Sequence, residues 1–520
     1  MKTKFNLIVI LLLIGHFLPM AVVQGGPPPH GEPIANTHWQ LFLDDYVIER
    51  STGFQRVLHH PTPQGVVIKA DKPWETLGLS VMYVGRREDG RFECYYRVHG
   101  SNLPGDTTAY AVSDDGIHWD KPNLGLVDGP NGKENNLLPC GAPFEIGRYG
   151  NVTDPDKQFM LSLGDKPLGH KMQVFFARQL PDWENDPMWR DKLVKSGSKP
   201  SYKLGLHFWD DLHDEWVFMR QSPNHPPTRC VGRWATKDLQ NWTVRPVFYP
   251  DAHDSTDPRF FDEVYGMHAM HTEGILLGFA EWMIGDQTRP DMAVLEQELI
   301  GRVHMKGTME IRITVSRDGG FTWDRTVSRE AWIPHGTEHD SYNRCVRFYT
   351  SPLRMGDEDW FYCTVINGDH GSGYDYYRNR SPVIQGGLYL QKHHRYVSLK
   401  AGNRPQILIT KPMQVMGNKL QLNVDASHGE VRVGVGTNDV IPLPNSPSHK
   451  GILPNYVVRD RQGNTHLETG FHIEDCKPVQ VDSIQHTVEW KDAGLESLQG
   501  KTVRLYILVQ DANLYGFRWQ

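Results

Sequence analysis

The sequence predicts an all-β protein, a five-bladed β-propeller followed by a C-terminal β-sandwich. Two observations support this fold class. A short turn phrase, containing Ser or Thr, then Asp, then Trp at similar offsets, occurs three times after strand-like runs. Towards the end of the chain the phrase no longer occurs, while short alternating strands with polar turns continue.

The clearest copy of the phrase is "TVSRDGGFTWDR", residues 314–325. Alternating apolar residues before it are typical of a half-buried strand. Asp318-Gly319-Gly320 provides a short polar side chain and residues that tolerate positive φ, as a tight turn requires. Trp323 adds a large apolar surface for packing. The phrase contains no nucleophile beside a base, so we interpret it as a structural turn rather than a ligand contact.

Two further copies are "SDDGIHW", residues 113–119, and "TKDLQNW", residues 236–242. Three copies of one hairpin turn indicate a repeated β unit. Radially arranged repeats of about four strands form a propeller.

The N-terminus predicts an exported protein. Residues 1–25 combine Lys2 and Lys4 with an apolar core over residues 5–14 and small residues near position 25, which is typical of a signal peptide. Residues 26–37, "GPPPHGEPIANT", form a Pro-rich linker. No other stretch is long and apolar enough to span a membrane. We therefore expect a secreted or periplasmic protein without a membrane span after cleavage.

The mature chain divides into two expected domains. Strand and turn signals over residues 38–395 predict the propeller. Residues 405–520, with runs such as "KLQLNVDA", "EVRVGV" and "KTVRLYILVQ", predict an antiparallel sandwich.

Composition excludes some function classes. The net charge is −7, with 55 Lys and Arg against 62 Asp and Glu, which argues against a nucleic-acid binder. The six cysteines form no CxxC pair, so a zinc or redox site is not indicated. Export permits disulfides, but Cys94 and Cys363 lie in strand-like runs, where buried free thiols are equally expected.

A propeller brings residues from the starts of its inner strands into one central funnel, although they are distant in sequence. Glycoside hydrolysis needs two carboxyl groups, about 5–5.5 Å apart for retention and roughly 6.5–9.5 Å apart for inversion. Carboxylates near strand starts are therefore the candidates to examine.

The chain resembles five-bladed β-propeller glycoside hydrolases of the family 43 and family 32 type. The resemblance is carried by "LFLDDYVIER" (41–50) and the three turn phrases. It is similar, over nearly the whole mature chain, to secreted planctomycete-type glycosyl-hydrolase-like proteins with a tail like "RYVSLKAG…KLQLNVDASHGEVRV…LYGFRW". It lacks the "NDPNG" signature of family 32.

The resemblance implies an early Asp as nucleophile or base, a middle Asp that tunes the pair, and a later Glu as acid. The matching catalytic candidates are Asp44, Asp45, Asp154, Asp262, Glu263 and Asp340. Alternation along a strand lets only one of Asp44 and Asp45 face the funnel, and either could instead cap a turn.

Other residues are candidates for binding substrate. They are Arg97, His268, Glu338, His370, Tyr374 and Arg378, the last three from the Gly-rich and aromatic loop 367–382. Arginine suits bidentate contact with carboxylate or sulfate. For His268 and His271 we weigh metal ligation or acid catalysis against ordinary, partly buried histidines.

These observations predict a secreted glycoside hydrolase that acts on a poly- or oligosaccharide with a carboxylate pair in the funnel. The first alternative is a non-catalytic carbohydrate-binding propeller, and the second is a surface interaction or structural protein. We expect a carbohydrate partner and no cofactor, with a structural calcium ion left open.

Overall fold

A computed structural model describes the chain from residue 32 onward, with internal gaps. The described ranges are 32–100, 107–130, 132–139, 145–148, 154–163, 172–185, 194–199, 208–222, 229–257, 259–286, 307–337, 342–370, 384–436 and 467–520. Strands make up nearly all the regular structure of these residues, which also contain short 3₁₀ helices, so the all-β prediction is confirmed. The predicted signal peptide lies outside the described residues. Within them, no helix is both long and apolar enough to cross a membrane.

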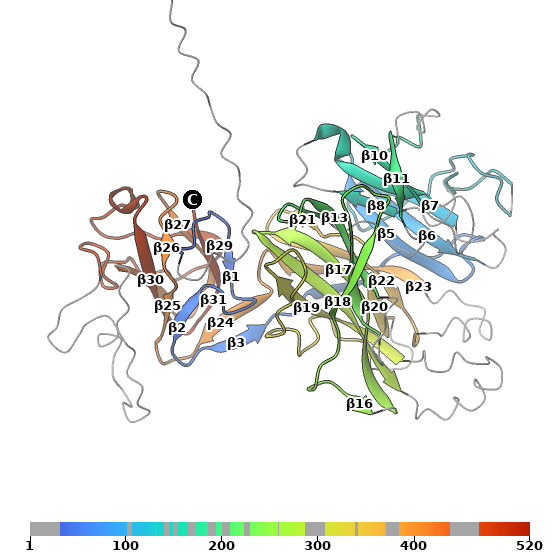
Figure 1. Ribbon diagram of the computed structural model, residues 1–520. Coiled ribbons are helices and arrows are strands. Elements are labelled where there is room, and N and C mark those ends of the chain that lie inside the picture. The colour runs from blue at the N-terminus through green and yellow to red at the C-terminus, as the bar shows by residue number, and fades with distance from the viewer. Residues whose placement is uncertain are drawn as a thin grey trace, which may run out of the picture.

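Between Thr62 and Lys392 the strands form five consecutive antiparallel groups (Figure 1). The first group is β5 (Gly78–Arg86), β6 (Phe92–His99) and β7 (Thr107–Ser113). The second is β8 (Glu145–Arg148), β9 (Phe159–Leu163), β10 (Met172–Ala177) and β11 (Val194–Lys199), with the 3₁₀ helix η1 (Pro155–Lys157) before β9. The third is β12 (Phe208–Asp210), β13 (Glu215–Gln221), β14 (Val231–Thr236) and β15 (Thr243–Phe248).

The remaining two groups complete this region. The fourth is β16 (Thr256–Asp257), β17 (Phe260–Thr272), β18 (Ile275–Asp286) and β19 (Gly307–Ser316). The fifth is β20 (Cys345–Arg347), β21 (Leu353–Met355), β22 (Glu358–Ile366) and β23 (Ile384–Lys392), joined by the early strand β4 (Thr62–Ile68).

Single parallel bridges link neighbouring groups. Met309 of β19 pairs with Cys345 of β20, and Ile384 of β23 pairs with Gly78 of β5. Strand β4 pairs antiparallel with β23, so the beginning and end of the region lie together. A closed five-bladed ring remains a prediction.

The turn phrase is a repeated structural turn, as expected. In the clearest copy, Gly320 N donates to Ser316 Oγ at 2.9 Å and Thr322 N donates to Asp318 Oδ1 at 2.9 Å. Trp323 Nε1 donates to the carbonyl of Gly320 at 3.0 Å. The copies at 113–119 and 236–242 make the same Ser/Thr and Asp bonds. The copies at 113–119 and 236–242 follow β7 and β14, the third strands of their groups, and the copy at 314–325 follows β19, the fourth strand of its group.

The residue after each turn Asp adopts a positive φ. Gly116 and Gly319 have φ of 77° and 74°, and Leu239 has 55° at the equivalent position. Only glycine visits this region without steric cost. Leu239 is nevertheless buried in the core of its group, so its packing offsets the backbone strain.

The C-terminal strands form two further sheets. They are β24 (Val397–Ala401), β25 (Gln406–Thr410), β26 (Met413–Gln414), β27 (Leu420–Asp425), β28 (Glu430–Gly436), β29 (Asp482–Thr487), β30 (Thr502–Gln510) and β31 (Ala512–Trp519), with the 3₁₀ helix η4 (Leu495–Leu498). Buried residues of both sheets share one core.

The earliest described strands belong to these sheets rather than to the region that follows them. Strand β1 (Gln40–Leu41) pairs with β31, β2 (Ile48–Ser51) with β25, and β3 (Gln55–Leu58) with β24. Figure 1 shows them in blue among the orange and red C-terminal strands. The expected boundary at residue 38 did not anticipate this pairing, because strand signals do not reveal a partner more than 300 residues away.

The cysteines that the structure describes are buried free thiols: Cys94, Cys230, Cys345, Cys363 and Cys476. Cys140 lies outside the described residues.

Candidate functional site

Asp44 and Asp45 lie in the connection between β1 and β2, against the turn that follows β19. Asp44 forms a two-pronged ion pair with Arg317, at 2.7 Å to Nε and 3.0 Å to Nη2. The Arg317 guanidinium also stacks over the ring of Tyr46, 3.8 Å from its centroid. Asp45 has a side chain that is 72% exposed and pairs with Arg56. The described contacts of both residues are therefore structural ion pairs.

Asp154 caps the short helix η1. Its carboxylate accepts a hydrogen bond from Asp156 N at 3.0 Å and pairs with Lys157 at 3.1 Å. The backbone bond and the Lys157 ammonium hold the pKa of Asp154 below its usual value. This contact set is that of a helix cap.

Four further candidates lie outside the described residues, so the structure does not place them. They are Glu338, Asp340, Tyr374 and Arg378.

Asp262 and Glu263 are adjacent on β17 and therefore face opposite sides of the β17–β18–β19 sheet. Asp262 accepts hydrogen bonds from Trp282 Nε1 at 2.9 Å and Ser255 N at 2.7 Å. Glu263 accepts two from Arg229, one from the backbone N at 3.2 Å and one from Nη1 at 3.0 Å.

The face that carries Glu263 also carries a group of arginines. Arg220 comes from β13, Arg229 from the segment before β14, and Arg347 from β20. All three converge on Tyr265, and together these four residues are named the arginine cluster. The guanidinium carbons lie 5.9, 5.4 and 4.8 Å from the Tyr265 ring centroid, respectively. Three groups of strands thus meet at one side chain.

A β-bulge aims Tyr265 at the arginines. The register between β17 and β18 shifts between Val264 and Gly266, which leaves Tyr265 without a partner in the ladder. Bulges commonly redirect a side chain beside an active site. Gly266, directly after the bulge, pairs with Glu281 of β18.

Glu281 is the most buried charged residue of the site, with a side chain that is 0% exposed. Its Oε2 lies 3.4 Å from Arg347 Nε and 3.5 Å from Arg220 Nη1. Its Oε1 is also buried and has no hydrogen-bond donor within the described part of the chain. Glu281 thus presents one occupied and one vacant oxygen.

Tyr349 forms a second aromatic wall. Arg220 and Arg347 lie over its ring at 6.0 and 5.0 Å from the centroid. Burial raises the pKa of Tyr349 to about 12, opposed by the charge of Arg347, so its phenol is neutral at physiological pH. Cation–π contacts from both rings hold the guanidinium groups in position.

His370 and a neighbouring ion pair border the cluster. The His370 ring lies 4.6 Å from the Tyr265 ring, and its backbone N donates to the carbonyl of Gly307 at 2.7 Å. Next to it, Arg344 Nη2 donates to Asp369 Oδ1 at 2.8 Å. Of the substrate-binding candidates, His370 is the one that the structure places beside Tyr265.

The remaining two described candidates, His268 and Arg97, make other contacts. His268 Nε2 is 3.2 Å from Ser351 Oγ, and burial lowers the pKa of His268 to about 4, so the ring is neutral. Arg97 lies on β6, paired in register with Ser80 and Thr108. His271 Nε2 bonds to the carbonyl of Trp209 at 3.0 Å.

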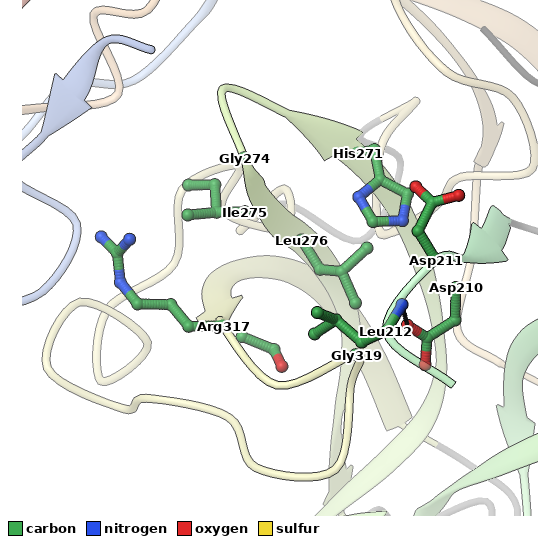
Figure 2. A pocket seen from close by; sticks show the side chains of 10 residues that line it. Asp210, Asp211, Leu212, His271, Gly274, Ile275, Leu276, Arg317 and Gly319 are labelled. Atoms are coloured by element: carbon green, nitrogen blue, oxygen red, sulfur yellow. Dashed lines mark hydrogen bonds between the residues drawn. The ribbon is translucent and has the colours of Figure 1, made fainter. Parts of the chain in front are cut away.

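Figure 2 shows a pocket that is separate from the arginine cluster. Asp210, Asp211 and His271 lie on one side of it and Arg317 on the other. Asp210 also belongs to a group with His213 and Glu215, in which one ligand atom of each residue lies within 4.8 Å of the others. Arg233 pairs with both carboxylates, at 2.5 Å to Asp210 and 2.6 Å to Glu215. These acids therefore already have a cationic partner.

Sequence reasoning missed Glu281, Arg220 and Arg347. Each is a single charged residue within an apolar run, "ILLGFAEWMI", "WVFMRQ" and "CVRFY". Charged residues are almost never fully buried unless they are paired or functional. An isolated charge inside a strand-like run is the signal that could have identified them.

Comparison with protein-family models gives no match, and no curated protein matches. Solved structures of carbohydrate-active enzymes are similar at low sequence identity. A glycoside hydrolase aligns with a TM-score of 0.40 and 12% identity over 64% of this chain and 92% of its own. A protein described with the GH130 mannoside phosphorylases and hydrolases of β-1,2 mannosidic linkages aligns with a TM-score of 0.38 and 13% identity over 68% and 97%.

The arabinofuranosidase Arb93A of Fusarium graminearum, in complex with an iminosugar inhibitor, aligns with a TM-score of 0.37 and 11% identity over 64% and 98%. The chain is thus similar in structure to glycoside hydrolases, and the roles of its residues have to be argued from its own site.

Proposed function

We propose that the chain is a glycoside hydrolase in which Glu281 and Glu263 form the carboxylate pair. The vacant, buried Oε1 of Glu281 is the observation that carries the proposal. A buried polar atom without a partner costs free energy, so its retention needs an explanation. A substrate atom that bonds to Oε1 during catalysis provides one.

The two carboxylates lie on one face of β17 and β18. Glu263 pairs in register with Met283, and Glu281 lies two residues before Met283 on the same strand. In a regular antiparallel pair the Cα atoms of such diagonal neighbours are about 7–8 Å apart, and here the bulge at Tyr265 lies between the two positions. Inverting glycoside hydrolases separate their carboxyl groups by roughly 6.5–9.5 Å, which leaves room for a water molecule. We propose an inverting reaction for this pair, and the anomeric configuration of the first product released, followed by NMR, tests it.

The contacts of each residue support different roles. Arg229 donates to both oxygens of Glu263 and orients it, which suits the general base that takes a proton from the attacking water. Glu281 can carry a proton on Oε1 and donate it to the leaving oxygen. As water bonds to the anomeric carbon, the bond from that carbon to the leaving oxygen breaks, and the two protons end on Glu263 and the leaving group.

We also propose that the protein is exported, which rests on the signal-like residues 1–25. The expected partner is a carbohydrate of the extracellular or periplasmic space.

The test is hydrolysis of neutral, uronic-acid-containing and sulfated polysaccharides, measured as new reducing ends. Glu281→Gln and Glu263→Gln should each lower the rate by about 10²–10⁴-fold, the usual contribution of general acid–base catalysis. The matched control is Glu310→Gln, which alters a buried carboxylate on the opposite face of the same sheet and should leave the rate nearly unchanged. Full activity in Glu281→Gln would contradict the proposal. Saccharide binding without hydrolysis by the unaltered protein would instead support a binding module.

A further inference from the structure

We infer that the arginine cluster binds an oxyanion, a carboxylate or a sulfate, carried by the ligand of this site. That the ligand is a sugar acted on by Glu263 and Glu281 rests on the proposed function. The anion site itself rests on the hydrogen-bond donors and charges described below.

Most donors of the cluster are unused among the described residues. Within the described ranges, Arg220 and Arg347 each have one polar contact, to Glu281 Oε2, at 3.5 and 3.4 Å. Strong bonds between arginine and carboxylate measure about 2.7–2.9 Å, and a guanidinium offers five N–H donors. Two nearly buried guanidinium groups thus share one distant oxygen and retain donors for a further acceptor.

The charges of the cluster do not balance. Arg220, Arg229 and Arg347 have side chains that are only 10%, 14% and 16% exposed. They face the carboxyl groups of Glu263 and Glu281, so among the described residues one buried positive charge is unmatched when both acids are ionised, and two are unmatched while Glu281 carries the proton that it donates. Burying an unpaired charge is costly, and an anionic ligand would offset this cost.

The cluster is held in place before any ligand binds. The rings of Tyr265 and Tyr349 support the guanidinium groups from two sides. Gly266 lets Arg220 approach, because a Cβ atom at this position would lie 2.4 Å from Arg220 Nη1 and 2.9 Å from Glu281 Oε2. A preorganised set of donors binds an anion without paying for its own rearrangement.

Arginines beside the opposite face of this sheet instead have short bonds to acids. Arg325, for example, donates to Asp254 at 2.9 and 3.2 Å. The unmatched donors are therefore local to the face of the β17–β18–β19 sheet that carries Glu263 and Glu281, which we call the Tyr265 face. A planar fork suits carboxylate and sulfate oxygens alike.

The experiment measures binding by calorimetry on the unaltered full-length protein, with oligosaccharide probes whose glycosidic oxygens are replaced by sulfur so that no probe is consumed. The probes are a galacturonic-acid oligosaccharide and its neutral methyl ester, and a sulfated galactose oligosaccharide and its desulfated form. We expect at least one charged probe to bind on the order of 10-fold tighter than its neutral partner. The two charged arms identify the carboxylate or the sulfate as the preferred group.

Arg347→Met or Arg220→Met should weaken binding of the preferred charged probe by about 10–100-fold, with little effect on its neutral partner. Arg347→Lys keeps the positive charge but loses the planar guanidinium, and it should have an intermediate effect. This variant controls for a loss of binding that results from misfolding. Arg312→Met on the opposite face is the matched control and should retain the preference. The inference is overturned if neither charged probe binds better than its partner, or if Arg312→Met and Arg347→Met weaken binding equally.

Failure of the inference and failure of the proposed function give different results. Preferential binding of a charged probe, combined with no hydrolysis by the unaltered protein, supports the anion site and rejects the hydrolase. Hydrolysis of neutral polysaccharides only, with no preference for charged probes in binding, supports the hydrolase and rejects the anion site.

Discussion

The two faces of the β17–β18–β19 sheet carry similar residues in different arrangements. On one face, acids and arginines form a saturated network. Arg312 Nε donates to Glu310 at 2.7 Å, and Arg325 donates twice to Asp254. Asp262 accepts hydrogen bonds from Trp282 Nε1 and from a backbone amide.

The other face is unsaturated. Among the described residues, one oxygen of Glu281 has no donor, and Arg220 and Arg347 reach its second oxygen only at 3.4–3.5 Å. Both faces belong to one sheet, so strand geometry does not explain the difference. Charged groups that satisfy one another's hydrogen bonds stabilise the fold. Groups with unsatisfied hydrogen bonds are what a ligand-binding site would use, and such sites commonly lower stability.

The largest expected contrast in stability comes from removing one charge on each face. Asp254→Ala removes the most buried partner of Arg325 and leaves it the longer contact to Asp251 at 3.3 Å, so it should lower the free energy of unfolding by up to about 3 kcal/mol. Arg347→Met relieves an excess of positive charge and should leave stability unchanged or higher. Urea unfolding of both variants measures the difference. Equal losses would show that the two faces are equivalent and would remove the basis for a ligand site.

The next contrast uses a buried carboxylate outside both faces. Glu93 on β6 accepts long hydrogen bonds of 3.4 Å from Tyr95 and Tyr110. Burial raises the pKa of Glu93 from its usual 4.5 to about 7, opposed by the charge of Arg87.

Because the folded state favours the protonated form, this group destabilises the fold as pH rises from about 4.5 to about 7. The loss should reach about 3 kcal/mol. Glu93→Gln, which cannot ionise, should remove this part of the pH dependence and be more stable than the unaltered protein at pH 8. Thermal unfolding at several pH values measures this, and an unchanged pH profile in Glu93→Gln would contradict it.

The sequence predicted the strands and turns better than it predicted which strands pair. Period-2 runs and the Ser/Thr–Asp–Trp turns identified an all-β chain with repeated hairpins, because both signals are local. The pairing of β1, β2 and β3 with the C-terminal sheets was missed, because strand patterns do not specify distant partners. Ring closure, the domain boundaries and the signal peptide remain predictions.

For the site, the sequence identified Glu263 and His370 but not the residues around them. Arg220, Glu281 and Arg347 come together through strand register and through the bulge at Tyr265. Neither can be read from a single sequence, because a one-residue change of register would turn these side chains to the other face.

Alanine substitutions at two glycines of the β17–β18 hairpin distinguish a steric effect on the arginine cluster from a steric effect on the hydrophobic core. Gly266→Ala would push a Cβ atom to 2.4 Å from Arg220 Nη1, whereas Gly278→Ala would push one to 2.7 Å from the Trp323 ring. Each should cost about 1–3 kcal/mol of stability by overpacking. Gly266→Ala should also weaken binding of the charged probe, while Gly278→Ala should not. Equal binding by both variants would show that Arg220 does not depend on the space beside Gly266.

The smallest contrast tests the repeated turn, where charge serves only local structure. Asp318 accepts hydrogen bonds from Phe321 N at 3.0 Å, Thr322 N at 2.9 Å and Thr322 Oγ1 at 2.7 Å. Asp318→Ala leaves these donors to solvent, so we expect a loss of about 1–2 kcal/mol in the free energy of unfolding and no change in hydrolysis. Asp318→Asn, which keeps one acceptor oxygen, should lose less. Abolished hydrolysis in a folded Asp318→Ala variant would show that the turn contributes to the catalytic site. The carboxylate of Asp318 would then have a functional role, as we propose for Glu263 and Glu281, and not only a structural one.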